Sequence, residues 1–174
     1  MAGKATAVLG FLSALDRAPH GVLGGYLLLN QSGRPLEFHC TVPVKPNRAQ
    51  EILYGATLRP YLYGELIGQT LFKKATSVPV VLCTDHRDML ALRSFVSVPV
   101  VQVFGGDGAS SSDGELVSRS DAFELGFNKL AVDPAHASDR QLVADQLGEL
   151  ATSFDLSEPF TRIREAIQEA QQGK

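Results

Sequence analysis

The sequence predicts a mixed α/β fold, because segments typical of strands and segments typical of helices follow one another along the chain. Apolar and polar side chains alternate through residues 36–41, as they do in a strand with one buried face. Two short runs rich in β-branched residues, 78–84 and 98–104, flank a helix-like segment at 85–95. That order is typical of two parallel strands joined by a helix, so a mixed sheet is expected.

The N-terminal part is predicted to form an antiparallel hairpin or a three-stranded meander. Apolar runs at 5–15 and 22–29 are separated by a turn-forming stretch at 16–21, which contains a proline and a glycine. A second turn signal, Asn-Gln-Ser-Gly at 30–33, precedes the alternating segment. Strands separated by such short turns pair with their sequence neighbours.

A long, kinked helix is predicted next. Asn47 is followed three residues later by a glutamine, which is a capping-box arrangement, and an apolar face continues to about residue 75. Pro60 lies inside this segment and should kink or break the helix just before it. Gly64 and Gly68 fall on one helical face, so we expect a close approach there, most simply against a sheet.

The last third is predicted to hold a flexible loop, one more strand and a C-terminal helical pair. Residues 105–121 are rich in Gly, Ser and Asp and poor in apolar side chains, which favours a flexible loop. Alternation predicts a strand within 123–132, and capping signals predict a helix over about 138–154. An amphipathic helix over 157–172 ends the chain.

Composition indicates a single globular domain spanning 1–174. The chain has 174 residues, 44% of them hydrophobic, and 16 Lys and Arg against 19 Asp and Glu, so its net charge is 16 − 19 = −3. A chain of this size buries a core without disulfides. The acidic balance argues against a generic nucleic-acid or membrane binder, because phosphate contacts need a net basic field.

The sequence favours a cytoplasmic protein. No run reaches the roughly 18 apolar residues that a membrane helix needs, and the short apolar N-terminal segment lacks a signal-peptide cleavage site. Cys40 and Cys83 are too few for a disulfide scaffold, and both lie in apolar stretches, as reduced thiols do. We therefore expect a reducing compartment and no membrane.

Charge is uneven along the chain. Residues 1–104 carry ten basic and six acidic side chains, 10 − 6 = +4, and residues 105–174 carry six and thirteen, 6 − 13 = −7. Either these are solvated faces of one domain, or the acidic part docks a basic partner.

One candidate for chemistry lies where the strand at 78–84 ends. Cys83, Asp85 and His86 stand at the carboxyl end of a predicted parallel strand, where ligands bind in open α/β sheets. A thiol, a carboxylate and an imidazole there suit a nucleophile–base pair. The alternative is that Asp85 caps the next helix and Cys83 is a buried strand residue. Motifs such as Cys-x-x-Cys or a phosphate loop are missing, so we expect neither a metal nor a cofactor.

A second candidate is an aromatic segment at the predicted helix kink. Tyr54, Arg59, Tyr61 and Tyr63 lie close together in the sequence, and Tyr and Arg are favoured anchors of protein interfaces. The same residue types stack on nucleic-acid bases, although few cations stand nearby for phosphate contacts. The alternative is structural, with the rings packed on the sheet and the hydroxyls at the surface.

The C-terminal helix offers a third candidate surface. Phe160, Ile163 and Ile167 form a narrow apolar stripe along it. Such a stripe either docks on the protein's own sheet or binds in a groove of a partner.

These observations favour a non-catalytic protein-interaction or scaffolding subunit of a larger cytoplasmic complex. The aromatic segment and the C-terminal stripe would bind a protein partner; nucleic acid is not expected, and a homo-oligomer stays open. The first alternative is a small enzyme, a hydrolase or transferase, that uses Cys83, Asp85 and His86 with the loop at 105–121 as a lid. The second is a single-stranded nucleic-acid-binding module that depends on Arg59 or Tyr61.

Overall fold

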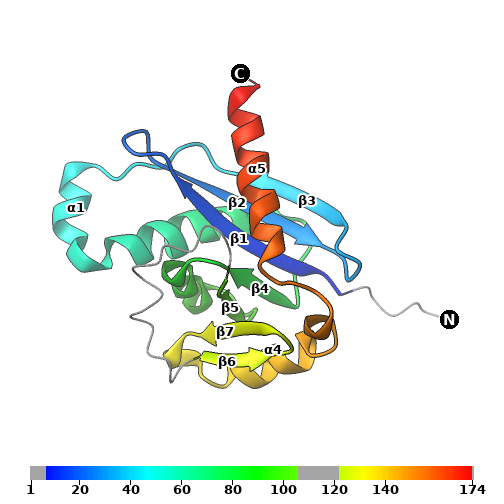
Figure 1. Cartoon of the computed structure of the whole chain (residues 1–174). Coiled ribbons are helices and arrows are strands. Elements are labelled where there is room, and N and C mark those ends of the chain that lie inside the picture. Colours follow the sequence, from blue (N-terminus) through cyan, green and yellow to red (C-terminus); the bar gives the residue numbers. More distant parts are fainter. Residues whose placement is uncertain (1–6, 106–121, 174) are drawn as a thin grey trace.

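A mixed sheet lies at the centre of the computed structural model, which describes residues 7–105 and 122–173. Within these residues seven strands follow the order β3-β2-β1-β4-β5-β7-β6 (Figure 1). Together with the helices around it, the sheet confirms the predicted mixed α/β fold. The strands are β1 (Leu9–Asp16), β2 (Val22–Leu29), β3 (Pro35–Cys40), β4 (Val81–Thr84), β5 (Val100–Val103), β6 (Ala122–Leu125) and β7 (Asn128–Val132).

Helices connect the strands and cover both faces of the sheet. In the described part, no helix has the length and apolarity that crossing a bilayer requires. The helices are α1 (Arg48–Tyr54), the 3₁₀ turn η1 (Gly55–Thr57), the π-helix η2 (Pro60–Gly68), α2 (Gln69–Lys74), the 3₁₀ helix η3 (Arg87–Phe95), the 3₁₀ turn η5 (Pro134–His136), α4 (Asp139–Leu147), the 3₁₀ turn η6 (Leu150–Thr152) and α5 (Glu158–Gln172).

The N-terminal strands form the predicted antiparallel meander. β1 pairs with β2 over its whole length, from Leu9 opposite Leu29 to Asp16 opposite Val22. β2 in turn pairs antiparallel with β3, which is an edge of the sheet. Because β2 is an interior strand and buried throughout, its sequence is a continuous apolar run and not an alternating one.

The predicted strand–helix–strand unit is also present. β4 lies parallel to β1 on one side and to β5 on the other, and η3 connects β4 to β5. The alternation at 123–132 belongs to a hairpin of β6 and β7 instead of one strand. Gly126 makes this tight turn with φ +61°, a conformation that glycine adopts without strain. Apart from Gly105, the predicted loop at 105–121 lies outside the described residues.

The predicted helix break occurs, and it is spread over several residues. α1 begins with the expected capping box at Asn47, since its side chain accepts from Gln50 N and the Gln50 side chain accepts from Asn47 N. The helix ends at Gly55, and after one 3₁₀ turn Pro60 begins the π-helix η2. Proline is tolerated there because the first turn of a helix leaves its N–H groups without helical acceptors. The break turns η2 onto the sheet while α1 has no buried residue.

The core consists of two apolar layers, one on each face of the sheet. One layer joins the sheet to α4 and α5, and the other joins it to η2, α2 and η3. Two adjacent glycines of β2 allow both layers to approach: a Cβ on Gly25 would lie 2.5 Å from Cγ2 of Ile163, and one on Gly24 would lie 2.9 Å from Cδ1 of Leu71. The predicted close approach at Gly64 is made by η3 rather than by the sheet, because a Cβ there would lie 2.8 Å from Cβ of Ala91.

The helix α5 lies across the sheet (Figure 1), and its apolar stripe packs on the protein's own sheet. Phe160, Ile163 and Ile167 are all at most 1% exposed, and the Phe160 ring meets that of Phe11 edge-on with centroids 5.7 Å apart. These three residues are therefore not available to a partner, and their assignment as partner-binding residues is corrected. The sequence could not decide this because both outcomes need the same stripe.

Candidate functional site

Polar side chains meet at the carboxyl ends of the neighbouring parallel strands β1 and β4. Leu12 pairs with Thr84 in the register of these strands, so the residues that follow β4 lie beside the last residues of β1. Ser13 and Asp16 come from β1, and Asp85 and His86 come directly after β4. The carboxyl ends of parallel strands are where ligands bind in open α/β sheets.

Asp85 is a buried carboxylate with two hydrogen-bond donors from other elements. Its side chain is 1% exposed. The Ser13 hydroxyl donates to Oδ1 over 2.7 Å, and Nη1 of Arg164, from α5, donates to Oδ2 over 2.7 Å. A buried charge needs this pairing, because an isolated carboxylate in the interior is unstable. Asp85 therefore does not cap the following helix, as one of our alternatives held.

His86 lies beside Asp85 and carries the imidazole of the site. Its Nε2 lies 3.2 Å from the carbonyl oxygen of Ala14 and 3.7 Å from Oδ1 of Asp85. A carbonyl oxygen only accepts, so this hydrogen bond places a proton on Nε2 and leaves Nδ1 as the ring atom that can take one up. On one side the ring contacts Tyr63, with centroids 5.4 Å apart.

Cys83 does not join Asp85 and His86. It is fully buried in the apolar layer under α4 and α5, and burial raises the pKa of its thiol from 9.0 to about 12. A thiol with that pKa stays protonated near neutral pH, and only the thiolate is a good nucleophile. Of the three residues grouped in the sequence, two reach the site and Cys83 is a core residue.

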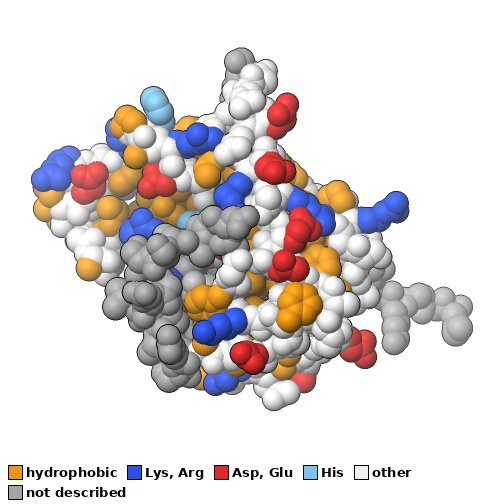
Figure 2. All heavy atoms as spheres, viewed as in Figure 1, with side chains coloured by type: hydrophobic (Ala, Val, Ile, Leu, Met, Phe, Trp, Pro, Cys, Tyr) orange, Lys and Arg blue, Asp and Glu red, His pale blue; other side chains and the backbone are white. Residues whose placement is uncertain are grey.

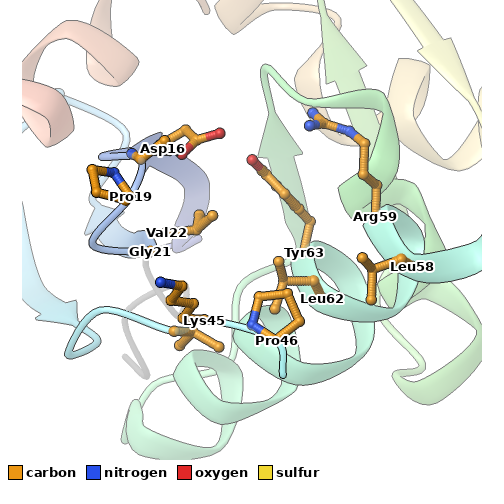
Figure 3. Close-up of a pocket in the computed structure, with 12 residues that line it drawn as sticks. Asp16, Pro19, Gly21, Val22, Lys45, Pro46, Leu58, Arg59, Leu62 and Tyr63 are labelled. Carbon is orange, nitrogen blue, oxygen red and sulfur yellow. Dashed lines mark hydrogen bonds between the residues drawn. The ribbon is translucent and has the colours of Figure 1, made fainter. Parts of the chain in front are cut away.

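A pocket of about 250 Å³ opens beside this cluster, between the β1–β2 turn, residues 44–46 and η2. Figure 3 shows Asp16 and Val22 on one wall, Tyr63 and Leu62 on the other, and Lys45 near the base. The pocket combines apolar side chains with the charged residues Asp16, Lys45 and Arg59, as small-ligand sites do. Its lining residues are Asp16, Ala18, Pro19, Gly21, Val22, Val44, Lys45, Pro46, Leu58, Arg59, Leu62 and Tyr63.

Arg59 and Tyr63 form one wall of the pocket as a unit. The guanidinium carbon of Arg59 lies 4.7 Å from the centre of the Tyr63 ring, and its Nε donates to Oδ2 of Asp88 over 2.9 Å. Burial raises the pKa of the Tyr63 hydroxyl, so the group stays protonated and can donate a hydrogen bond. A cation held over an aromatic face is a favourable contact of about 0.5–2 kcal/mol.

The predicted aromatic segment divides into two pairs. Tyr54 and Tyr61 stack on each other at 4.1 Å with 15° between the rings, and both are half-buried. Tyr63 instead turns inward, is 2% exposed and lines the pocket with Arg59. The helix break at 55–59 lies between Tyr54 and Tyr61 in the chain, and the sequence spacing alone did not indicate this pairing.

Three residues of the site escaped the sequence analysis. Arg164 lies on the last helix, and nothing in the neighbouring sequence indicates a partner 79 residues earlier. Lys45 is an exposed residue between two prolines. Ser13 did carry a usable signal, since a polar residue inside an apolar strand needs a hydrogen-bond partner.

No family model matches the sequence, and neither does any curated protein sequence. Solved structures do match over most of the chain. Endonuclease V from Ciona intestinalis, in complex with a 24mer DNA containing an inosine followed by a ribo-adenosine, aligns with TM-score 0.55 and 11% identity, covering 98% of this chain and 88% of that chain. The catalytic domain of human Endonuclease V aligns with TM-score 0.52 and 15% identity, over 97% and 85%. Human ENDOV aligns with TM-score 0.51 and 16% identity, covering 95% of this chain and 86% of that chain. At these sequence identities the comparison shows that this chain and the solved structures share a fold.

This likeness corrects our prediction of a non-catalytic protein-interaction or scaffolding subunit. Four solved structures that share the fold are of Endonuclease V, and two of them hold DNA, against our expectation of a protein partner and no nucleic acid. That prediction depended on missing motifs. In this fold the strand-end cluster comes from separate elements, so it leaves no contiguous motif to find.

Proposed function

We propose that the protein is a nucleic-acid-processing enzyme whose single-stranded substrate lies across the carboxyl ends of β1 and β4. The observation that carries the proposal is the pocket lined by Lys45, Arg59 and Tyr63, in which the Tyr63 ring contacts the ring of His86. The DNA complex among the structures of the same fold supports a nucleic-acid partner.

The pocket and its surroundings supply the two kinds of contact that single strands need. Lys45 is exposed at the pocket, and Arg48 is exposed at the start of α1, so both are placed to neutralise phosphates. The stacked pair Tyr54 and Tyr61 offers half-buried rings to bases, and base stacking contributes about 1–3 kcal/mol per base. A single strand exposes its base faces, whereas a duplex hides them.

The negative net charge does not oppose this proposal, because binding responds to the local field. Residues 1–104 carry +4, and they include the pocket, the stacked pair Tyr54 and Tyr61, and the pair Arg59 and Tyr63. Figure 2 shows acidic and basic side chains mixed over the face that carries α5, in keeping with ordinary solvated surface there.

His86 is the group proposed for acid–base chemistry. In phosphodiester hydrolysis its Nδ1 would accept the proton of the attacking water, while solvent protonates the oxygen that leaves phosphorus. The carbonyl of Ala14, 3.2 Å from Nε2, and the carboxylate of Asp85, 3.7 Å from it, hold the ring in place. Asp85 is thus a positioning residue, and Cys83 has no part in this chemistry.

Binding is tested with short fluorescent single strands of DNA and RNA in an anisotropy titration. We expect the affinity to fall as the salt concentration rises. Lys45→Ala should lower the affinity about tenfold, because it removes one charge-assisted contact. Lys73→Ala is the matched control, because Lys73 is equally exposed but lies at the end of α2. Equal affinities of the two variants, or no binding of the wild type at low salt, would refute the proposal.

Cleavage is tested with the same strands on a sequencing gel. His86→Ala should abolish product formation while the anisotropy signal for binding remains. Product formation that is unchanged in His86→Ala would exclude His86 as the acid–base group.

A cytoplasmic location belongs to the same proposal. Both cysteines are free, Cys83 in the core and Cys40 half-buried, which suits a reducing compartment.

A further inference from the structure

We infer that Arg164 takes the place of a divalent cation at the strand ends, so that the chain brings its own positive charge to Asp85. The observation is the contact itself: the guanidinium donates to Oδ2 over 2.7 Å, and the carboxylate is 1% exposed. Phosphodiester-cleaving enzymes commonly hold a metal ion against buried carboxylates. Here a side chain of the same chain provides the charge.

The carboxylate of Asp85 does not fit a metal ion. One oxygen accepts from Ser13 and the other from Arg164, so both have protein donors. Nε2 of His86, the ring atom nearer to Asp85, carries a proton toward Ala14 and has no lone pair for a ligand bond. In the described ranges, no three His, Cys, Asp or Glu side chains come together as metal ligands do.

Arg164 is held in this position by the packing of α5. The neighbouring Ile163 and the next turn's Ile167 are buried against β1 and β2, which fixes the helix on the sheet. The backbone that carries Arg164 is therefore already ordered where the guanidinium meets Asp85. Three elements, β1, β4 and α5, converge on this one carboxylate.

The same guanidinium can also bind an anion. It has five N–H donors, and Asp85 takes one of them among the described residues. With 16% of its side chain exposed, Arg164 offers the others to a phosphate at this edge of the sheet. Phosphate binding by Arg164 depends on the proposed function. The inference that Asp85 does not bind a metal ion does not depend on it.

The first experiment needs no nucleic acid. Manganese binding is followed by the loss of the free Mn²⁺ spin-resonance signal with the wild-type protein, Asp85→Asn, Arg164→Gln and Arg162→Gln. We expect wild type and Asp85→Asn to bind manganese equally, and Arg164→Gln to bind it at least as well. Arg162→Gln is the matched control on α5, because its guanidinium pairs with Glu158 instead. Manganese binding by the wild type that Asp85→Asn abolishes would overturn the inference.

Folding is controlled with the double variant Asp85→Asn with Arg164→Gln. Removing the arginine alone leaves a buried charge without its partner, so Arg164→Gln should melt lower than the double variant. The opposite order would show that the pair is not coupled and would contradict the inference.

The second experiment separates this inference from the proposed function. If the wild type binds single strands, the affinity should be the same in magnesium and in EDTA, and Arg164→Gln should reduce it about tenfold while Arg162→Gln does not. A requirement for magnesium that Asp85→Asn removes would overturn the inference. A wild type that binds no single strand refutes the proposed function and leaves the manganese result to decide on Arg164.

Discussion

The hydroxyl of Ser13 lies 2.7 Å from Oδ1 of Asp85, joining adjacent parallel strands at residues 72 positions apart. Ser13→Ala would leave that carboxylate oxygen buried without its donor. We expect the free energy of unfolding to fall by about 1–3 kcal/mol, measured by urea denaturation. Ser94→Ala, at an exposed position of η3, is the control and should change it little. Equal effects would mean that the hydrogen bond contributes nothing.

A second prediction concerns the contact between β2 and α5. A Cβ on Gly25 would lie 2.5 Å from Cγ2 of Ile163, so Gly25→Ala should push α5 away from the sheet. The expected cost is about 1–3 kcal/mol of unfolding free energy. Adding Ile163→Ala should cost less in the Gly25→Ala background than in the wild type, since it relieves the clash. Strict additivity would show that α5 adjusts without strain.

Glu37 gives the protein a predictable response to acid. Hydrogen bonds from His39 and from the backbone N–H groups of Thr76 and Ser77 hold the pKa of this carboxyl at about 2, below its ordinary 4.5. Because the folded pKa is the lower one, the carboxylate stabilises the fold above about pH 4.5 and this contribution is lost as the pH falls toward 2.

The Glu37→Gln variant tests this linkage. It should melt lower than the wild type at neutral pH, and the two melting temperatures should converge as the pH approaches 2. Glu124→Gln, on the exposed side of β6, is the control. A gap between the wild type and Glu37→Gln that stays constant down to that pH would contradict the assignment.

The two cysteines should differ in reactivity. Cys83 is buried with its pKa raised to about 12, whereas Cys40 is half-buried near the edge of the sheet. A thiol reagent should therefore modify one cysteine in the native protein and two after denaturation. The Cys40→Ser variant should lose the native reaction. Rapid native labelling of Cys83 would mean that the layer under α5 opens far more readily than its burial indicates.

Much of the fold could be predicted from the sequence, because local patterns of residues determine individual strands and helix ends. The alternation at 36–41, the two β-branched runs and the capping box at Asn47 each correspond to an observed element. Only part of the candidate site could be predicted from the sequence. Asp85 and His86 could be placed at a strand end, but their partners Ser13 and Arg164 come from distant elements, and only the tertiary fold brings them together.

Function was mispredicted for a related physical reason. Catalytic motifs that a sequence reveals are contiguous, whereas the polar cluster here has contributions from β1, β4, η2 and α5. Apolar and aromatic surfaces were then assigned to a protein partner. Three of those residues, Phe160, Ile163 and Ile167, are core, and Tyr63 is a pocket wall.

Photo-crosslinking tests the central claim most directly. A single strand carrying iodouracil is irradiated with the wild-type protein, and the adduct is located by mass spectrometry of tryptic peptides. We predict adducts on the peptide 49–73, which holds Tyr54, Tyr61 and Tyr63 and stays whole because trypsin does not cut between Arg59 and Pro60. Adducts confined to peptides from β6, β7 or α4, with this peptide unmodified, would contradict nucleic-acid binding at the strand ends.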